Sequence, residues 1–470
     1  MANFVLSTHM TNGDVLPFLR LASALRRRGH KATLVTHGAF KPLADKAGIA
    51  FRGIDEPEEY TEIMKDLYMM EDPLNKPDLY EAYQRKYYSM EKFRKEYDML
   101  TELCREEHSV LICKERDGFV AMIVSEMMGV PIVTGVLAPN YVTQLHIWEE
   151  LGLDFAISLI NKFRCDLGLS PVANWTSWMG AVNKNVGFWH QSFDEAVEAP
   201  TWALKVETVG FPLADDTEYE PLPDGLLSFI AAGEPPLLIT GGTGKMIKPN
   251  FYHAAIEGVK AFGGRAILVT RHEEFIQEEL PDHIVWYKIL PLAGVYPLVG
   301  GVIHHGGIGT ITGAMASAVP QLALAADTDR PDNGMRIKHL GIGNYLPPLQ
   351  WQPELIANAI KGMQSPLVKE RCRQLAKVLE EHDTMEAACA AMESVVGRPE
   401  FAIDSAALEK DYDSSRLTAA SRDDNAVARS RAKAAGGREM SASKRSLLAQ
   451  LLAQRQLGKA PFSAKGALHE

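Results

Sequence analysis

Cysteine is scarce in this sequence of 470 residues, which contains only five. The five are far apart, and no two of them form a C-x-x-C pair. They are Cys104, Cys113, Cys165, Cys372 and Cys389. A disulfide framework and a zinc site both need closely placed cysteines, so this pattern argues against either and indicates thiols buried in a core.

Long hydrophobic runs and excess positive charge are also missing. No run approaches the length that spans a bilayer, and the first residues, "MANFVLSTHM", lack a basic start followed by a long apolar stretch. We therefore expect a cytoplasmic protein with no membrane span. The formal net charge is −11, which argues against a general affinity for nucleic acid.

What is present is typical of a globular chain with two or three domains, since 46% of the residues are hydrophobic and 23% are charged. An apolar strand at Phe4–Thr8, an amphipathic helix from about Pro17 to Arg28 and a second strand at Lys31–Thr36 predict a βαβ start, and hence a parallel sheet. Apolar runs continue this series at Val110–Cys113, Ala121–Val124 and Pro131–Val136.

A second βα series begins after the Pro- and Asp-rich residues 211–225, which have the composition of a linker. Its predicted strands are Leu237–Thr240, Ala266–Thr270, Ile284–Trp286, Gly301–His304 and Gln321–Leu324. The fold class is therefore α/β, with two doubly wound units facing each other across a cleft, where ligands usually bind. From residue 396 the chain has thirteen Lys and Arg against nine Asp and Glu, which predicts a flexible basic tail with one amphipathic helix at 441–456.

A glycine-rich turn in the second series carries the clearest chemical signal. The stretch "VIHHGGIGT" at 302–310 predicts a strand, a tight turn and a helix start, which leaves backbone N–H groups free to bind an anion. His305 lies at the edge of that turn. The next predicted strand delivers Asp329, Arg330 and Asn333 to the same edge of the sheet, where polar groups can bind hydroxyls.

The span from Val302 to Gly343 resembles the nucleotide-sugar signature of inverting glycosyltransferases of the macrolide and rhamnolipid (rhamnosyltransferase chain) type. These enzymes belong to the UDP-glycosyltransferase superfamily and have the GT-B fold of two Rossmann-like domains. The stretches "NGDVLPFLRLASALRRRGHKATLVTHGAF", "FPLADD" and "LPLAGVYPLVGGVIHHGG" resemble the same family, so that the likeness covers about residues 3–395. It implies an acceptor-binding domain at 1–215, a linker at 216–235, a donor-binding domain at 236–395 and a tail at 396–470.

The resemblance implies transfer of a sugar from a UDP- or dTDP-sugar to a hydroxyl of a hydrophobic natural product or lipid, with inversion and with neither metal nor cofactor. The nucleotide sugar is a co-substrate, and its diphosphate would be bound by the imidazole and backbone N–H groups of the turn. The implied donor-binding residues are Gly242, Thr243, Ile289, Leu290, His305, Gly307, Gly309, Thr310, Asp329, Arg330 and Asn333.

Three positions depart from the family pattern. Arg330 stands where glutamine is usual, and Gly313 replaces an acidic or amide residue that could bind ribose. Ile289 occupies the position of a base-stacking aromatic, which leaves Tyr287, Trp286 or the backbone to hold the base. The identity of the sugar is therefore open.

The reaction also needs a base to deprotonate the acceptor hydroxyl. Asp14 in "NGDVLP" matches the position of the base in the family, although a plain helix cap is the alternative reading of an aspartate there. His9 is the second candidate, and Glu115 or Asp117 could assist.

Aromatic residues in the first half are candidates for binding a hydrophobic acceptor, with core packing as the alternative. They are Trp148, Trp175, Trp178, Phe188 and Trp189. Two other motifs fail: "GGTGKM" at 241–246 lacks the hydroxyl residue that holds magnesium in a P-loop, and the "DTD" at 327–329 places its last residue in the sugar pocket.

Two other functions fit the same fold. One is a nucleotide-sugar epimerase or phosphorylase, and the other is a catalytically idle partner protein that uses the tail for assembly. The helix expected at 441–456 is too short to be stable alone and needs a partner surface. Three surfaces fit this need: a synthase module, a second copy of this chain, or the body of the enzyme itself.

Overall fold

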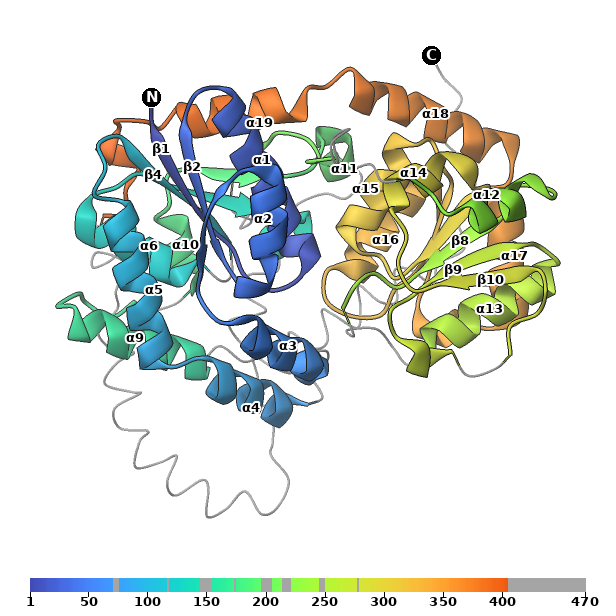
Figure 1. Ribbon diagram of the computed structural model, residues 1–470, viewed down its shortest axis with the longest axis horizontal. Helices are drawn as coiled ribbons and strands as arrows, with labels where there is room; N and C mark the ends of the chain where they lie inside the picture. Colours follow the sequence, from blue (N-terminus) through green and yellow to red (C-terminus); the bar gives the residue numbers. More distant parts are fainter. Residues whose placement is uncertain are drawn as a thin grey trace.

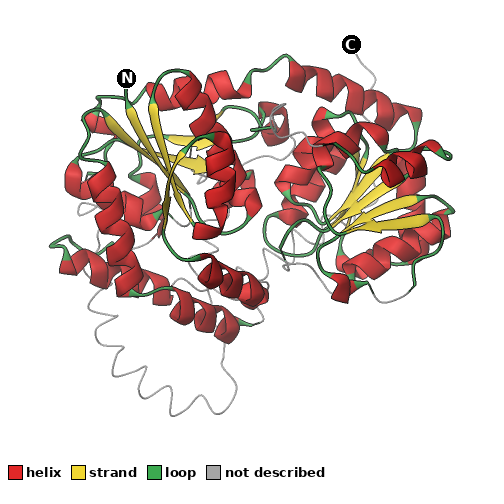
Figure 2. Ribbon diagram, viewed as in Figure 1, coloured by secondary structure: helices red, strands yellow, loops and turns green. Residues whose placement is uncertain are grey.

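The computed structural model describes residues 1–70, 76–115, 118–143, 154–172, 175–195, 205–213, 221–244, 250–276 and 279–404. Two parallel sheets, each with helices on both faces, form two domains side by side (Figures 1 and 2). The first sheet has the order β3-β2-β1-β4-β5-β6-β7, and the second has the order β10-β9-β8-β11-β12-β13. This architecture confirms the predicted α/β class with two doubly wound units.

The first domain is built around the central strands β1 and β4, which are paired with each other. Its strands are β1 Asn3–Ser7, β2 Lys31–Thr36, β3 Ala50–Gly53, β4 Ser109–Lys114, β5 Ile132–Val136, β6 Asn185–Gly187 and β7 Glu207–Thr208. Its helices are α1 Asn12–Arg27, α2 Lys41–Ala47, α3 Pro57–Asp66, α4 Pro77–Tyr87, α5 Met90–Leu103, α6 Phe119–Met128, α7 Pro139–Thr143, α9 Asp154–Asp166, α10 Trp175–Gly180 and α11 Gln191–Glu195.

The second domain is built around β8 and β11, which are likewise paired. Its strands are β8 Leu237–Thr240, β9 Ala266–Val269, β10 Ile284–Tyr287, β11 Gly301–His304, β12 Gln321–Leu324 and β13 Gly343–Leu346. The helices that follow the first domain are α12 Asp224–Ala231, α13 Phe251–Phe262, α14 Leu292–Val295, α15 Ile308–Ala316, α16 Arg330–His339, α17 Pro353–Met363, α18 Pro366–Glu380 and α19 Thr384–Glu393.

Two local predictions in the first domain differ from the structure. The apolar run Ala121–Val124 lies in helix α6, whose residues 119–125 are all buried. A short run that is apolar on every side does not distinguish a buried strand from a buried helix. Helix α1 begins at Asn12 rather than near Pro17, because the Asp14 carboxylate accepts hydrogen bonds from the backbone N–H and the hydroxyl of Thr11 and so starts the helix earlier.

The domain boundaries also differ from those expected. Helix α12 falls inside the expected linker, yet its Leu226 is buried in the core of the second domain. At the other end, α19 returns to the first domain and packs on α1, and Ile403 is buried there as well (Figure 1). The predicted start of the tail at residue 396 is therefore too early, because the chain is still packed on the first domain at Ile403. One cysteine also departs from expectation, since Cys165 is exposed while the other four are buried.

The two domains share one apolar cluster. Trp189 and Phe193 of the first domain pack there with Ile311 and Ile337 of the second. The buried guanidinium of Arg336 on α16 donates a hydrogen bond of 2.6 Å to the carbonyl oxygen of Phe193. This contact joins α16 of the second domain to α11 of the first.

Candidate active site

The glycine-rich turn that follows β11, residues 305–309, is clamped through its backbone. Gly306 has φ +91°, a conformation that glycine adopts without strain. Its N–H donates to Nδ1 of His304 at 3.0 Å, and its carbonyl oxygen accepts from Nδ2 of Asn333 at 3.1 Å. Both polar groups of this residue are thereby satisfied inside the protein. The first N–H groups of a helix such as α15 have no partner inside the helix and can bind an anion.

His304 braces this turn as a neutral ring. Its Nε2 lies 3.1 Å from Oε1 of Gln321, and Nε2 of Gln321 donates to the carbonyl oxygen of Ile311 in α15. Because Nδ1 accepts from Gly306, Nε2 must be the protonated nitrogen. Burial lowers the pKa of His304 to about 4, so the ring stays neutral near neutral pH.

The side chain of His305 lies between Gly307 of the glycine-rich turn and Gly242 of the turn after β8. A Cβ placed on Gly242, which has φ +77°, would lie 2.8 Å from the His305 ring, so only glycine allows this approach. Burial, and next the positive charge of Arg330, hold the pKa of His305 well below its usual range. A neutral imidazole and an arginine therefore lie together at this turn, and an arginine there adds a positive charge where glutamine would add none.

Asp329 and Asn333 also help to hold the glycine-rich turn in place. Asp329 accepts hydrogen bonds from the Thr328 hydroxyl at 3.0 Å and from Asn333 Nδ2 at 2.8 Å. Asn333 is fully buried, so it holds the turn from behind. Thr328 has φ +61°, which is uncommon for a residue with a branched side chain.

The remaining predicted donor residues differ in exposure. Ile289 is 59% exposed at the end of β10, while its neighbour Leu290 is buried in the core. Thr243 and Gly309 are exposed, Gly307 precedes the first residue of α15, and Thr310 is buried.

Gly313 has a structural explanation. A Cβ at this position would lie 2.3 Å from Cε2 of Tyr296, a buried ring that hydrogen-bonds with Thr310. The space of the usual larger side chain is thus filled by Tyr296.

Asp14 lies in the first turn of α1, in the first domain. One carboxylate oxygen accepts from Thr11, and the other accepts from Nζ of Lys114 at 2.8 Å. The side chain of Lys114 is only 5% exposed, and that of Asp14 is 18% exposed. Asp14 is therefore both a helix cap and an accessible carboxylate with a buried cationic partner.

Two histidine–carboxylate pairs lie near Asp14. Nε2 of His9 is 3.2 Å from Oε1 of Glu96, which also accepts a hydrogen bond from Ser7. Nδ1 of His37 is 2.5 Å from Oδ2 of Asp55, and the rings of His9 and His37 are 5.9 Å apart. Burial is the largest single effect and tends to raise the pKa of Asp55, but the hydrogen bond with His37, the positive charge of His37 and the backbone N–H of Gly38 together lower the pKa.

The sequence predicted only part of this cluster. His9 and Asp14 were named, whereas Lys114, Glu96 and His37 were missed. Lys114 ends β4 and His37 directly follows β2, so their positions at the carboxyl edge of a parallel sheet were a usable signal. Glu115 is fully buried, and Asp117 lies outside the described residues.

Three of the five aromatic residues predicted to bind the acceptor are buried in the structure. Trp178, Phe188 and Trp189 are at most 1% exposed and pack in apolar clusters, so the core reading is the correct one. Trp148 lies outside the described residues. Trp175 begins α10, but its side chain is not among those described.

Comparison with known proteins gives two family matches. Residues 4–147 match the glycosyltransferase family 28 N-terminal domain. Residues 258–408 match the C-terminal domain of erythromycin biosynthesis protein CIII-like proteins. The two matches fall on the two domains of the structure.

Curated relatives share about a quarter of their residues with this chain. A sterol 3-beta-glucosyltransferase of Arabidopsis thaliana, UGT80B1, is 25% identical over 80% of the chain, and the match covers 65% of that protein. The O-mycaminosyltylonolide 6-deoxyallosyltransferase of Streptomyces fradiae is 23% identical over 83% of the chain and 96% of its own length. The chain thus spans just under two thirds of the first relative and nearly all of the second.

Solved structures share the fold. The spinosyn forosaminyltransferase SpnP superposes with a TM-score of 0.63 at 14% identity, over 84% of this chain and all of that one. The calicheamicin glycosyltransferase CalG4 gives a TM-score of 0.59 at 18% identity, over 84% and 99% of the two chains. Among the described residues, every helix is too short or too polar to cross a bilayer.

Proposed function

Because this chain belongs to the UDP-glycosyltransferase superfamily and has its GT-B fold, we propose that it transfers a sugar from a UDP- or dTDP-sugar to a hydroxyl of a hydrophobic small molecule. The relatives that act on sterols and macrolides support this class of acceptor. We further propose inversion at the anomeric carbon, no requirement for a metal ion, and a cytoplasmic location.

The clamped glycine-rich turn is the observation that carries the proposal. Glycosyl transfer releases a nucleoside diphosphate whose negative charge grows in the transition state. Donors that are already oriented stabilise such charge most, because they do not reorganise during the reaction. His304 and Asn333 fix the turn. His305 and the N–H groups at the start of α15 would donate hydrogen bonds to the diphosphate, and the positive charge of Arg330 would stabilise its negative charge.

Asp14 is the proposed general base. Its partly exposed carboxylate lies on the opposite side of the cleft from the turn and would accept the proton of the acceptor hydroxyl as the hydroxyl oxygen attacks the anomeric carbon. Lys114 holds the carboxylate in one orientation. Attack from the face opposite the departing diphosphate in a single displacement inverts the configuration. The His9–Glu96 pair is the second candidate for this role.

The metal-free proposal rests on the same geometry. Arg330 and the turn neutralise charge that a metal would otherwise balance. Asp329, the last residue of the "DTD" stretch, has both carboxylate oxygens engaged by Thr328 and Asn333. We also propose the tail helix at 441–456, outside the described residues, as a contact for a synthase or a second copy of the chain.

Donor hydrolysis and transfer with a panel of UDP- and dTDP-sugars, with and without EDTA, test the proposal. The chain should turn over at least one donor, and EDTA should leave the rate unchanged. His305→Ala should lower kcat by about 10²–10³-fold, as loss of one transition-state donor does elsewhere. His339→Ala, which removes an exposed histidine on α16, is the matched control and should have no effect.

Two results would contradict the proposal. Binding without turnover of any donor would favour the idle partner protein, and release of an isomerised nucleotide sugar would favour the epimerase. Strict dependence of the activity on Mg²⁺ or Mn²⁺ would contradict the metal-free proposal and favour Asp327 and Asp329 as metal ligands.

A further inference from the structure

A cavity of about 260 Å³ lies between the two domains. The first domain lines it with Asn12 at the start of α1 and with one face of α3. The second domain lines it from the turns after β8 and β9. The full lining is Asn12, Tyr60, Thr61, Met64, Lys65, Thr243, Arg271 and His272.

The charge of this lining is unusual for the chain. The sequence has 60 acidic residues and a net charge of −11, yet the described residues that line the cavity include two cationic side chains and no carboxylate. Arg271 is exposed and makes no hydrogen bond or ion pair with any residue in the described ranges. Lys65 pairs with Glu62 in a contact where both side chains are more than half exposed, and such a pair separates at little cost.

The cavity adjoins the glycine-rich turn. Strands β9, β8 and β11 are neighbours in the second sheet, so Arg271, Thr243 and His305 follow one another along its carboxyl edge. Gly242, next to Thr243, contacts the His305 ring. From the other side, the negative charge of Asp14 and the positive charge of Arg271 both act on Tyr60, which places the cavity beside the proposed base as well.

We propose that this cavity is a second wall of the donor site, in which Arg271, on the same sheet edge as the glycine-rich turn, and Lys65, from the first domain, bind the diphosphate of the nucleotide sugar. This inference rests on the proposed function. A guanidinium presents a planar fork of N–H groups that fits phosphate oxygens, and an ammonium adds a point charge. The diphosphate would then bridge the two domains, with Lys65 on α3 and Arg271 after β9.

Calorimetric titration of the full chain with UDP, dTDP and uridine tests this assignment. Arg271→Gln and Lys65→Gln should each weaken UDP and dTDP binding by about tenfold or more, the usual effect of losing a charged hydrogen bond. The affinity for uridine, which has no phosphate, should not change. Arg271→Lys should restore part of the loss, and Arg373→Gln, which removes an exposed arginine paired with Glu370 on α18, should bind like the wild type.

Three outcomes overturn the inference and leave the proposed function standing. The first is that Arg271→Gln binds UDP with the wild-type affinity. The second is that Arg271→Gln loses affinity for uridine as much as for UDP. The third is that Arg271→Gln has a raised KM for the acceptor at saturating donor. The last would assign the cationic cavity to an anionic acceptor. A wild-type chain that binds neither diphosphate overturns the proposed function itself.

Discussion

Asp14 is held by groups of two kinds, the backbone N–H and hydroxyl of Thr11 on one oxygen and the ammonium of Lys114 on the other. The Thr11 contacts explain why an aspartate stands in the first turn of α1, and they would exist in a protein with no catalytic activity. The Lys114 contact needs a different reason, because burying an ammonium is costly unless a partner compensates. The role of general base that we propose for Asp14 would provide that reason, because the lysine would orient the carboxylate.

The role of Lys114 is tested by Lys114→Met, which keeps the length of the side chain and removes its charge. We expect kcat/KM for transfer to fall by about 10–100-fold, because Asp14 loses the partner that orients it. In the Asp14→Asn background the same substitution should cost little, since the carboxylate that it serves is already gone. The measurement is a double-mutant cycle on kcat/KM.

Lys86→Met is the control for this cycle, because it breaks an exposed ion pair with Asp66 on the same domain and should leave transfer unchanged. An equal loss in the wild-type and Asp14→Asn backgrounds would show that Lys114 acts on folding and not through Asp14.

Single residues were predictable from sequence only where a local motif carries them. Asp14 and His305 belong to short signatures. Lys114 is separated from Asp14 by 100 positions, and only the parallel pairing of β1 with β4 brings them together. Trp178 and Trp189 were misassigned because an aromatic side chain gives the same signal in a core as in a binding site.

The glycine-rich turn is a structural element that depends on an uncharged histidine behind it. The unfolded chain takes up a proton on this histidine near pH 6.5, whereas the folded chain takes it up only near pH 4. Acid therefore favours the unfolded state. The stabilisation is complete above pH 6.5 and is lost as the pH falls from 6.5 to 4, by about 3 kcal/mol in all.

Urea unfolding between pH 7.5 and pH 4 checks this value. Below pH 6.5 the free energy of unfolding of His304→Gln should fall less steeply with decreasing pH than that of the wild type. The difference in slope should correspond to the uptake of as much as one proton fewer on unfolding. His339→Gln, at an exposed position, should leave the steepness unchanged. Parallel curves for His304→Gln and the wild type would contradict the assignment, whatever the difference in their absolute stability.

Whole elements were predictable where an apolar run ends in a turn. The predicted bounds of β2, β8, β11 and β12 are those of the structure. Helix α6 was not predictable, because its residues 119–125 are all buried and show no period. The start of α1 required knowledge of which of several polar residues caps it.

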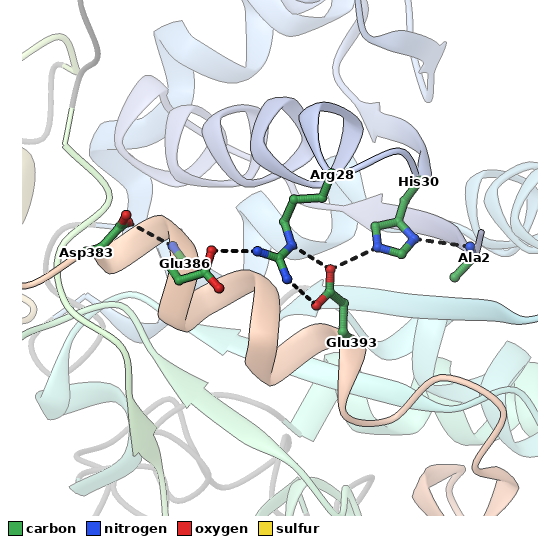
Figure 3. A network of polar contacts seen from close by, with 6 residues as sticks. All are labelled: Ala2, Arg28, His30, Asp383, Glu386 and Glu393. Atoms are coloured by element: carbon green, nitrogen blue, oxygen red, sulfur yellow. Dashed lines mark hydrogen bonds and ion pairs between the residues drawn. The ribbon is translucent and has the colours of Figure 1, made fainter.

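The two domains are joined a second time at the whole-molecule scale, by the return of α19 to α1. Figure 3 shows Arg28 between Glu386 and Glu393, with His30 on the far side of Glu393. The hydrogen bond from Arg28 is the main reason that the pKa of Glu393 is lowered. Beneath these polar contacts, Met392 and neighbouring small residues of α19 are buried against α1.

The buried contacts should outweigh the ion pairs. Met392→Ala removes a fully buried side chain and should lower the free energy of unfolding by about 2–5 kcal/mol. Arg28→Met should cost much less, because solvent screens its pairs. Urea unfolding of the two variants compares them, and a larger loss for Arg28→Met would show that the polar network, rather than packing, holds α19 in place.

The central claim is that this cleft performs sugar transfer with Asp14 as the base, and Asp14→Asn tests it most directly. Asparagine keeps an oxygen that can cap α1 but is a far poorer proton acceptor. Transfer from the best donor and the calorimetric affinity for its nucleoside diphosphate are measured on the same preparation. We predict that transfer falls by about 10²–10⁴-fold, while the affinity for the diphosphate stays at the wild-type value. Undiminished transfer, or a parallel collapse of diphosphate binding, would contradict the assignment of Asp14 as the base.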